Sequence, residues 1–405
     1  MKERKLENWI SSYMEYMENT ESASILHKWT CLSVLAGALR KKVNLSLGRL
    51  NIYTNMYVIL VGPPGAPRKS QAISYGVNFL REIPDLVISA DAITPQALIQ
   101  DLEASAVDEP LPEGKKLQHA SLTVISKELE SFLGQKGENT KMIVTLTDLF
   151  DAQEIPWKYR TKHYGTNTIP SVFLNILAAT TPESIVSSIP LNAVGGGLTS
   201  RIVFVWAERK EKKITRPIET SEELKLKDFL MQDLYVISRL AGSYNFTKDS
   251  YEFWDNWYQN YDSQSRKRKC VDPLFNGWYE RKPLYVQKLA IIIAASQGNE
   301  LVLKTNHFLE ALKILEDTEI PMINVFKSMG RSVIATDVDL VSKIIQSRKW
   351  VLEEQLVDLT WRDIDSAKLD NVIATVIRRG FAKRSYLGPK GEKGKLWYKY
   401  TGPDY

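Results

Sequence analysis

Five apolar runs, separated by segments with helical spacing, constrain the fold of this chain more than any other feature. The runs are YVILV (57–61), DLVIS (85–89), SLTVIS (121–126), VFLNILAAT (172–180) and SRIVFVWA (200–207). Strands that are apolar on both faces are typical of parallel sheets covered by helices on either side. The spacing therefore predicts an α/β fold over residues 49–210, with a mostly parallel sheet flanked by helices.

The rest of the chain favours helices. Residues 1–48 have helical apolar spacing and almost no breakers, and amphipathic segments recur through 211–330. In 331–405 the pattern predicts two helices, the second ending at Gly380, and then the hairpin FAKRSYLGPKGEKGKLWYKY. Helices followed by a basic hairpin indicate a winged helix.

Composition narrows the class of protein. Apolar residues make up 44% and charged residues 25% of the 405 positions, as in soluble globular proteins. The chain has no run of about 18 apolar residues, so no membrane segment is expected, and MKERKLENW lacks the apolar stretch of a secretion signal. Two cysteines and four histidines argue against a disulfide framework or a zinc site. We expect a cytoplasmic protein whose net charge of +5 is compatible with a polyanionic partner.

The stretch GPPGAPRKS follows the first apolar run and has the parts of a phosphate-binding loop. The order of parts is a strand, a turn with glycines, a lysine, a serine and a helix. This order directs backbone N–H groups and a cation at a bound phosphate. Lys69 would reach the β- and γ-phosphates, and Ser70 would hold Mg²⁺. The expected nucleotide-binding residues of this loop are Gly62, Pro63, Pro64, Gly65, Ala66, Pro67, Arg68, Lys69 and Ser70.

This loop departs from the usual pattern. Six residues separate Gly62 from Lys69, one more than usual, and Arg68 stands before the lysine in place of a glycine. The alternative is an ordinary proline-rich turn ahead of a helix.

Three more segments place chemical groups where such a site needs them. SLTVIS leads to Glu128, whose carboxylate would lie near Mg²⁺ and the attacking water, although it is also a plausible helix-start glutamate. LNILAATTP puts the Thr181 hydroxyl at the carboxyl edge of the sheet, where α/β folds bind ligands, unless it is a simple strand cap. GGGLTSR puts Arg201 at the start of a strand, where it can reach a neighbouring subunit's γ-phosphate or stand as a surface arginine.

Two basic segments suggest nucleic acid. WKYRTKHYGTNTIP (157–170) predicts a hairpin in which aromatic rings alternate with the cations Lys158, Arg160, Lys162 and His163. Cations that contact phosphates and aromatic rings that stack on bases are suited to binding a single-stranded nucleic acid. The alternative is an ordinary solvated hairpin. In the C-terminal unit, DNA contact is expected from Arg378, Arg379, Lys383 and Arg384. A small protein-interaction module with a basic face is the alternative there.

In this order the segments resemble the AAA+ ATPase core of ring helicases, over about residues 50–330. The likeness is greatest to phage- and plasmid-type replicative helicases related to superfamily 3 and the minichromosome-maintenance group. GPPGAPRKS is similar to Walker A, VISKE to Walker B, AATTP to sensor 1 and GLTSRIVFV to the arginine-finger segment. The resemblance implies roles as catalytic glutamate for Glu128, sensor 1 for Thr181 and finger for Arg201. It also makes 211–330 a helical lid, with Arg281 as sensor 2, and the basic hairpin a pore hairpin.

Walker B is incomplete in this sequence. Lys127 stands where the family usually has aspartate, and a cation there would oppose Mg²⁺ unless its side chain points away. Asp148 or Asp151 could supply the missing carboxylate.

The sequence therefore predicts an ATP hydrolase: a ring-forming DNA helicase or translocase acting in phage or mobile-element replication. The resemblance implies a hexamer that uses ATP and Mg²⁺, acts on single-stranded or forked DNA and works with a separate primase or another replication protein. If phage-encoded, it would act in the bacterial host's cytoplasm. One alternative is an ATP-gated initiator or helicase loader with little or no hydrolysis, which Lys127 favours. Another is a monomeric small-molecule phosphotransferase.

Overall fold

The computed structural model describes residues 3–89, 94–110, 116–134, 139–161, 165–189, 196–265, 268–270, 275–326, 333–362 and 364–402. The chain divides into two compact units, Met1–Phe326 and Lys327–Tyr405. The three segments expected at 1–48, 49–210 and 211–330 therefore fall, up to Phe326, within one unit.

The first unit is built on a six-stranded sheet in the order β10-β3-β9-β6-β4, with β5 paired to β6. Its strands are β3 (Tyr57–Val61), β4 (Val87–Ile88), β5 (Ala106–Pro110), β6 (Lys116–Ser126), β9 (Val172–Thr180) and β10 (Ile202–Trp206). Only β5 runs antiparallel to its neighbour. The prediction of a mostly parallel sheet is confirmed, and the five apolar runs form its five parallel strands.

Helices cover both faces of this sheet, which explains why β3 and β9 are buried along their whole length. The amide of Asn175 in β9 donates to the Ser33 carbonyl in α2 (Ser24–Leu39), at 3.1 Å. Tyr57 pairs with the next residue of β9, so it points to the opposite face. There its hydroxyl donates to the Leu146 carbonyl of α6 (Thr140–Leu149), at 2.9 Å.

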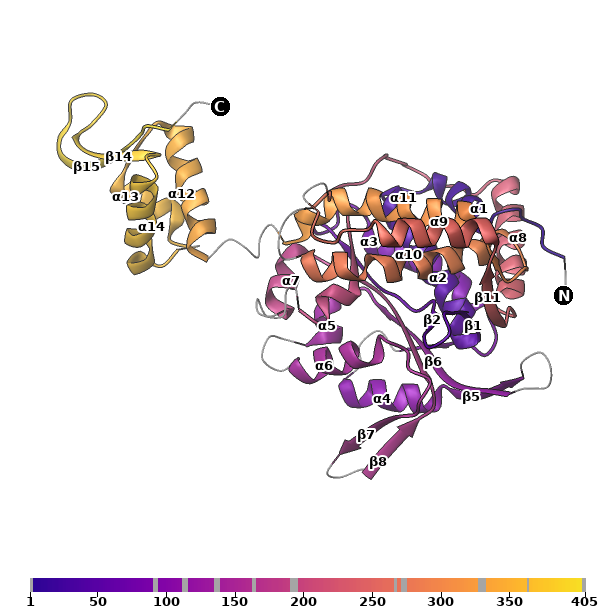
Figure 1. Cartoon of the computed structure of the whole chain (residues 1–405). Coiled ribbons are helices and arrows are strands. Elements are labelled where there is room, and N and C mark those ends of the chain that lie inside the picture. Colours follow the sequence, from indigo (N-terminus) through magenta and orange to yellow (C-terminus); the bar gives the residue numbers. More distant parts are fainter. Residues whose placement is uncertain are drawn as a thin grey trace. The chain divides into compact units, whose positions relative to one another are not determined.

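Several further helices and one hairpin precede β10. The α-helices are α1 (Trp9–Tyr16), α3 (Lys69–Arg81), α4 (Pro95–Ala104), α5 (Leu129–Leu133) and α7 (Pro182–Ser188). The 3₁₀-helices are η1 (Met17–Asn19), η2 (Arg40–Lys42) and η5 (Thr199–Arg201). The predicted hairpin at 157–170 is present as β7 (Trp157–Thr161) and β8 (Gly165–Ile169), which project from the sheet (Figure 1).

A second sheet, of four strands in the order β12-β11-β1-β2, includes strands from both regions that were predicted to be helical. Its strands are β1 (Val43–Ser46), β2 (Asn51–Tyr53), β11 (Gly242–Phe246) and β12 (Val302–Leu303). The expectation of helices alone was wrong here. Strands of two to five residues have too few positions to reveal a period, and β11 pairs with the distant β1.

The helices expected after residue 211 are present. They are α8 (Ser221–Ile237), α9 (Lys248–Gln259), α10 (Asn276–Gln297), α11 (Thr305–Met322) and η7 (Ile323–Phe326). α10 is buried on most of its surface, so it is a core helix of the first unit.

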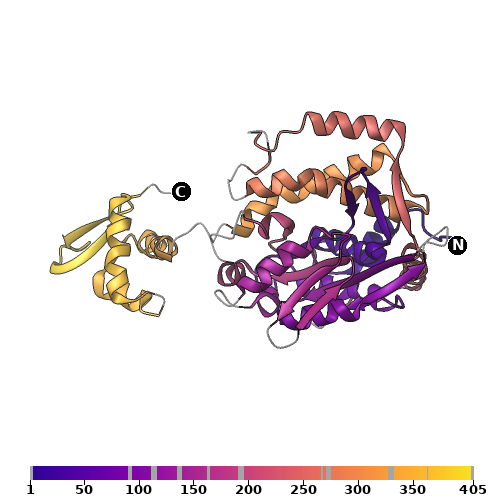
Figure 2. The same cartoon turned by 60° about the horizontal axis from the view of Figure 1, so that its bottom comes forward.

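The second unit packs helices against a small sheet (Figure 2). The sheet has three antiparallel strands in the order β13-β15-β14, and three helices belong to the unit. Its elements are α12 (Val333–Arg348), β13 (Trp350–Leu352), α13 (Glu353–Thr360), α14 (Ser366–Arg378), β14 (Ala382–Leu387) and β15 (Lys393–Tyr400). Val341, Val351, Leu356, Val372 and Tyr398 belong to its own core. The two expected helices and the hairpin are found, whereas α13 and β13 were not anticipated.

None of the helices within the described residues is long and apolar enough to cross a lipid bilayer.

Candidate functional site: a loop between two cavities

The loop after β3 ends at a helix that lacks a side-chain cap. α3 begins at Lys69, and the Arg68 side chain makes no capping hydrogen bond. The first turn also contains no acidic residue. The N–H groups at the start of a helix have no partner within it, and the helix dipole favours negative charge there. The start of α3 is therefore suited to bind an anion.

Arg68 stands where the usual phosphate loop has a glycine, and its backbone has a glycine-like conformation. Its backbone is left-handed, with φ 59° and ψ 39°, which is the conformation that a glycine adopts most easily. Holding a non-glycine residue there costs roughly 1–2 kcal/mol. Neighbouring contacts hold it in place: its guanidinium lies 3.1 Å from the Glu21 carboxylate, and its carbonyl accepts from the Ser22 hydroxyl at 3.1 Å.

Lys69 folds back onto its own loop. Its Nζ donates to the Gly62 carbonyl at 2.6 Å and to the Pro63 carbonyl at 3.0 Å. Burial lowers the pKa of Lys69, and the nearby Glu183 carboxylate opposes that shift. Glu183 was not singled out from the sequence because a helix-start acid ordinarily needs no other explanation.

The two glycines of the loop serve different purposes. A Cβ added at Gly62 would lie 2.0 Å from the Ala207 carbonyl oxygen, so this position has no room for a side chain. A Cβ at Gly65 would meet nothing within 4 Å, but Gly65 has a left-handed φ of +67°. Gly62 therefore allows close packing of the loop on the end of β10, and Gly65 allows the turn itself.

Replacing Gly62 by alanine is expected to destabilise the first unit by about 3 kcal/mol, because the added methyl group collides with backbone. Denaturant unfolding followed by circular dichroism would measure the change, with Gly65→Ala as the matched control. The control should lose about 1 kcal/mol, the cost of its backbone angle alone. Equal losses in the two variants would contradict the packing role of Gly62.

A cavity of about 270 Å³ joins the loop to the ends of β6 and β9. The carboxyl ends of parallel strands meet at one edge of a sheet, and β6 lies beside β9, which lies beside β3. The cavity is lined by Pro64, Gly65, Lys69, Ser70, Lys127, Glu128, Leu129, Glu130, Thr180, Thr181 and Ser184. The structure thus brings together the groups that the sequence singled out in the loop, in VISKE and in AATTP.

Within this smaller cavity, Glu128 is exposed and occupies the position before the first residue of α5. It is therefore both a helix-start glutamate and a cavity residue. The Thr181 hydroxyl caps α7 by accepting from the Ser184 N–H at 3.2 Å. Lys127 lines the same cavity. The catalytic roles of these residues stay predictions.

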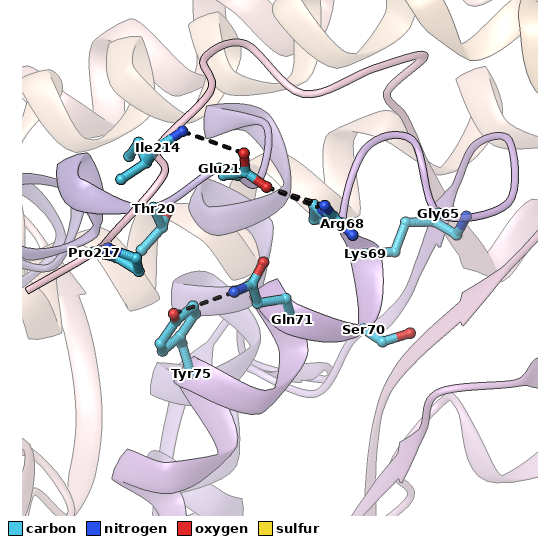
Figure 3. Close-up of a pocket in the computed structure, with 10 residues that line it drawn as sticks. All are labelled: Thr20, Glu21, Gly65, Arg68, Lys69, Ser70, Gln71, Tyr75, Ile214 and Pro217. Carbon is cyan, nitrogen blue, oxygen red and sulfur yellow. Dashed lines mark hydrogen bonds and ion pairs between the residues drawn. The ribbon is translucent and has the colours of Figure 1, made fainter.

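A larger cavity, of about 540 Å³, also borders the loop (Figure 3). It is lined by Thr20, Glu21, Gly65, Arg68, Lys69, Ser70, Gln71, Tyr75, Ile214 and Pro217. Gly65, Lys69 and Ser70 line both cavities. A single ligand lying across these three residues could therefore extend into both spaces.

Glu21 links three segments that border the larger cavity. Its carboxylate accepts from the Ile214 N–H at 3.2 Å and pairs with the Arg68 guanidinium (Figure 3). It also accepts from the Lys210 ammonium at 2.6 Å. The Lys210 hydrogen bond, together with these neighbours, lowers the pKa of Glu21. No sequence signal marked Glu21, since its partners lie 47 and 189 residues away along the chain.

Arg201 and Arg281 lie apart from the loop. Arg201 precedes Ile202, which pairs with Tyr57 at the amino end of β3. The loop leaves the other end of that strand, five residues on, so roughly 16 Å separates the two positions at about 3.3 Å per residue. Arg281 of α10 donates from Nε to the Ser200 hydroxyl at 3.2 Å, and it lines neither cavity. Burial lowers its pKa, and Arg201 adds to that effect.

Asp148 and Asp151 do not complete the metal site. Asp151 pairs with Arg201, and Asp148 accepts from the Trp157 indole. Neither residue lines the smaller cavity. The possibility that one of them replaces the missing Walker B carboxylate is not supported, because Asp148 lies in the last turn of α6 and Asp151 just after it, and this helix ends near the amino edge of the sheet.

The basic hairpin separates its charges from its rings. Lys158 and Arg160 are exposed, whereas the Trp157 and Tyr159 rings stack at 5.6 Å on the other side of β7. The expected cations Lys162 and His163 lie outside the described residues.

In the second unit, the four expected DNA-binding side chains are exposed: Arg378, Arg379, Lys383 and Arg384. They stand at the end of α14 and along β14. Lys383 also pairs across the sheet with Lys399, which places two lysines side by side on one face.

No family model matches this chain, and no curated protein matches it.

Proposed function

We propose that this chain is an ATP-dependent, ring-forming DNA helicase or translocase with an AAA+ core and a C-terminal winged helix, acting in phage or mobile-element replication. The observation that carries the proposal is the smaller cavity, which Lys69, Ser70, Glu128 and Thr181 line together. An uncapped helix start, a cation, a hydroxyl and a carboxylate in one cavity are the groups that hydrolysis of a nucleoside triphosphate requires.

In this proposal the triphosphate lies across the three residues shared by the cavities, and its γ-phosphate points into the smaller one. The nucleoside then occupies the larger cavity. The sugar and base would find apolar surface there on Tyr75, Ile214 and Pro217, and polar groups on Thr20 and Gln71.

The chemistry follows from the smaller cavity. Glu128 orients a water molecule and accepts its proton as the oxygen attacks the γ-phosphorus. The bond from that phosphorus to the bridging oxygen breaks, which releases ADP and phosphate. Lys69 exchanges its two loop carbonyls for phosphate oxygens and stabilises the charge that develops on them.

The residues present fit a Mg²⁺ ion in part. The Ser70 hydroxyl and the Glu128 carboxylate are oxygen donors in one cavity, and Mg²⁺ usually keeps several waters besides one or two carboxylates and substrate phosphates. The bound ion would neutralise phosphate charge. Lys127 weakens this fit because it adds a positive charge to the same cavity.

The placement of Arg201 supports a ring. A finger that lies at the opposite edge of the sheet from its own loop is suited to the site of another subunit, and a head-to-tail contact of this kind forms a ring when its rotation closes. Arg281 lies at the same edge, so we propose that any contact it makes with nucleotide is also to a neighbouring site. Six subunits remain the number that the resemblance implies.

DNA contact is assigned to two basic elements. The exposed Lys158 and Arg160 of the β7–β8 hairpin would follow the backbone of one strand in the ring. The helix-and-hairpin arrangement of the second unit supports a winged helix whose cations contact phosphates.

Steady-state ATP hydrolysis, with and without single-stranded DNA, tests the proposal. We expect the purified chain to hydrolyse ATP and single-stranded DNA to raise the rate. Duplex DNA of equal length is the control. A chain that binds ATP with no turnover under either condition contradicts the motor.

Lys127 is the observation that favours a second candidate function. Its position in the smaller cavity opposes Mg²⁺, as expected of an ATP-gated DNA-binding initiator or helicase loader with little or no hydrolysis. Nucleotide-dependent DNA binding without turnover is the result that would favour it.

A further inference from the structure

The C-terminal end of α6 contacts both the β7–β8 hairpin, which is proposed to bind DNA, and Arg201, which is proposed to reach a neighbouring subunit. The last turn of α6 carries Asp148, and its Oδ2 accepts from the Trp157 indole Nε1 at 2.5 Å. Trp157 is the first residue of the β7–β8 hairpin. Three residues after Asp148, the Asp151 Oδ2 lies 3.2 Å from Nη2 of Arg201.

Arg201 is held back in this arrangement. Only 12% of its side chain is exposed, and its Nη1 donates to the Gly197 carbonyl at 2.8 Å. Its guanidinium also lies over the Phe150 ring, 5.8 Å from the centroid. Within the described residues its Nε is buried without a hydrogen-bond partner. A guanidinium paired and covered in this way is not available to a neighbouring subunit's phosphate.

The helix end itself is attached to the sheet. The Tyr57 hydroxyl donates to the Leu146 carbonyl at 2.9 Å, and the Asn55 amide donates to the Phe150 carbonyl at 2.8 Å. The Lys41 ammonium donates to the Ala152 carbonyl at 2.6 Å. Hairpin and arginine are therefore tied to one element with a defined position, and not to two independent loops.

We propose that Asp151 and Asp148 are positioning residues that couple the hairpin to Arg201. Asp151 keeps Arg201 withdrawn, and Asp148 joins the hairpin to the same helix end. A DNA strand that displaces the hairpin pulls on this end and loosens the pair between Asp151 and Arg201. This inference rests on the proposed function, because the coupling is the step by which DNA bound in the ring stimulates ATP hydrolysis at the neighbouring subunit's site.

Asp151→Asn and Asp148→Asn in the full chain test this coupling, with the exposed Asp255→Asn of α9 as the matched control. Asp151→Asn removes the ion pair that withdraws Arg201. The rate of ATP hydrolysis without DNA should therefore rise about two- to fivefold, as expected for one partly exposed ion pair. Both variants should lose most of the stimulation by single-stranded DNA. Asp151→Glu should restore it, and the control should behave like the wild type.

Hydrogen exchange gives a second measurement that needs no turnover. Asp151→Asn should speed exchange in the β7–β8 hairpin, and Asp148→Asn should speed it in residues 197–206, although neither residue contacts the other's partner. The coupling is overturned if each substitution changes hydrogen exchange only around its own side chain. It is also overturned if Asp151→Asn lowers ATP hydrolysis equally with and without DNA. A wild type without hydrolysis would refute the motor, whereas the exchange result would still decide the coupling.

Discussion

ATP hydrolysis is expected to fall at least about 100-fold when Lys69 is replaced by alanine, since the substitution removes the cation that stabilises the transferred phosphoryl group. Lys69 stands between the two cavities and is held there by the Gly62 and Pro63 carbonyls. Alanine leaves those carbonyls unpaired and facing the phosphates, so nucleotide affinity should fall as well. Steady-state rates and titration with a non-hydrolysable ATP analogue would measure the two effects separately.

Lys127→Ala is the matched control, because Lys127 lines the same smaller cavity. The proposed metal site predicts that its removal maintains or raises turnover. If the two variants lose activity equally, the specific role of Lys69 is refuted, and a general need for positive charge would explain the result better.

Replacing Arg201 by alanine is expected to lower turnover about 1,000-fold, the lower limit for an arginine that stabilises phosphoryl transfer. The affinity for ATP should stay within a few-fold of wild type, because Arg201 lies roughly 16 Å from its own loop by the strand rise. The effect should therefore appear in kcat and not in KM. Steady-state kinetics over a range of ATP concentrations would show the separation.

Mixing two inactive variants tests whether Arg201 acts between subunits. Arg201→Ala retains an intact loop, and Lys69→Ala retains an intact finger. In an equal mixture about a quarter of random neighbouring pairs combine the two intact parts, so part of the activity should return. Mixed rings that stay as inactive as each variant alone would argue that no site is shared between subunits.

Local patterns were sufficient to predict the sheet and one edge of the site. Buried runs such as 57–61 and 172–180 are apolar on both faces, and this property belongs to each strand by itself. Once the strands are parallel, their ends converge, so Lys69, Glu128 and Thr181 had to lie near one another. The anomaly at Arg68 was also visible in the sequence, although its left-handed backbone was not.

The rest of the site depends on contacts that no local period encodes. Glu21 reaches Lys210 across 189 residues, and Arg281 reaches Ser200 across 81. The carboxylates of Asp148 and Asp151 illustrate the same limit. Their residue type suits a metal ligand, but the direction of α6 takes them to the other edge of the sheet. Composition can suggest such a group, and only the packing decides its partner.

The pairing of β1 with β11 has a consequence for how the chain is made. The Ser243 hydroxyl of β11 donates to the Asn44 side-chain carbonyl of β1 across 199 residues, so β1 emerges from the ribosome long before β11 exists. At about 5–20 residues per second, this wait lasts roughly 10–40 s. During synthesis the exposed edge of β1 is open to pairing with other nascent chains. Truncated products that stop before residue 242 would keep that edge, and they should therefore depend on chaperones or aggregate.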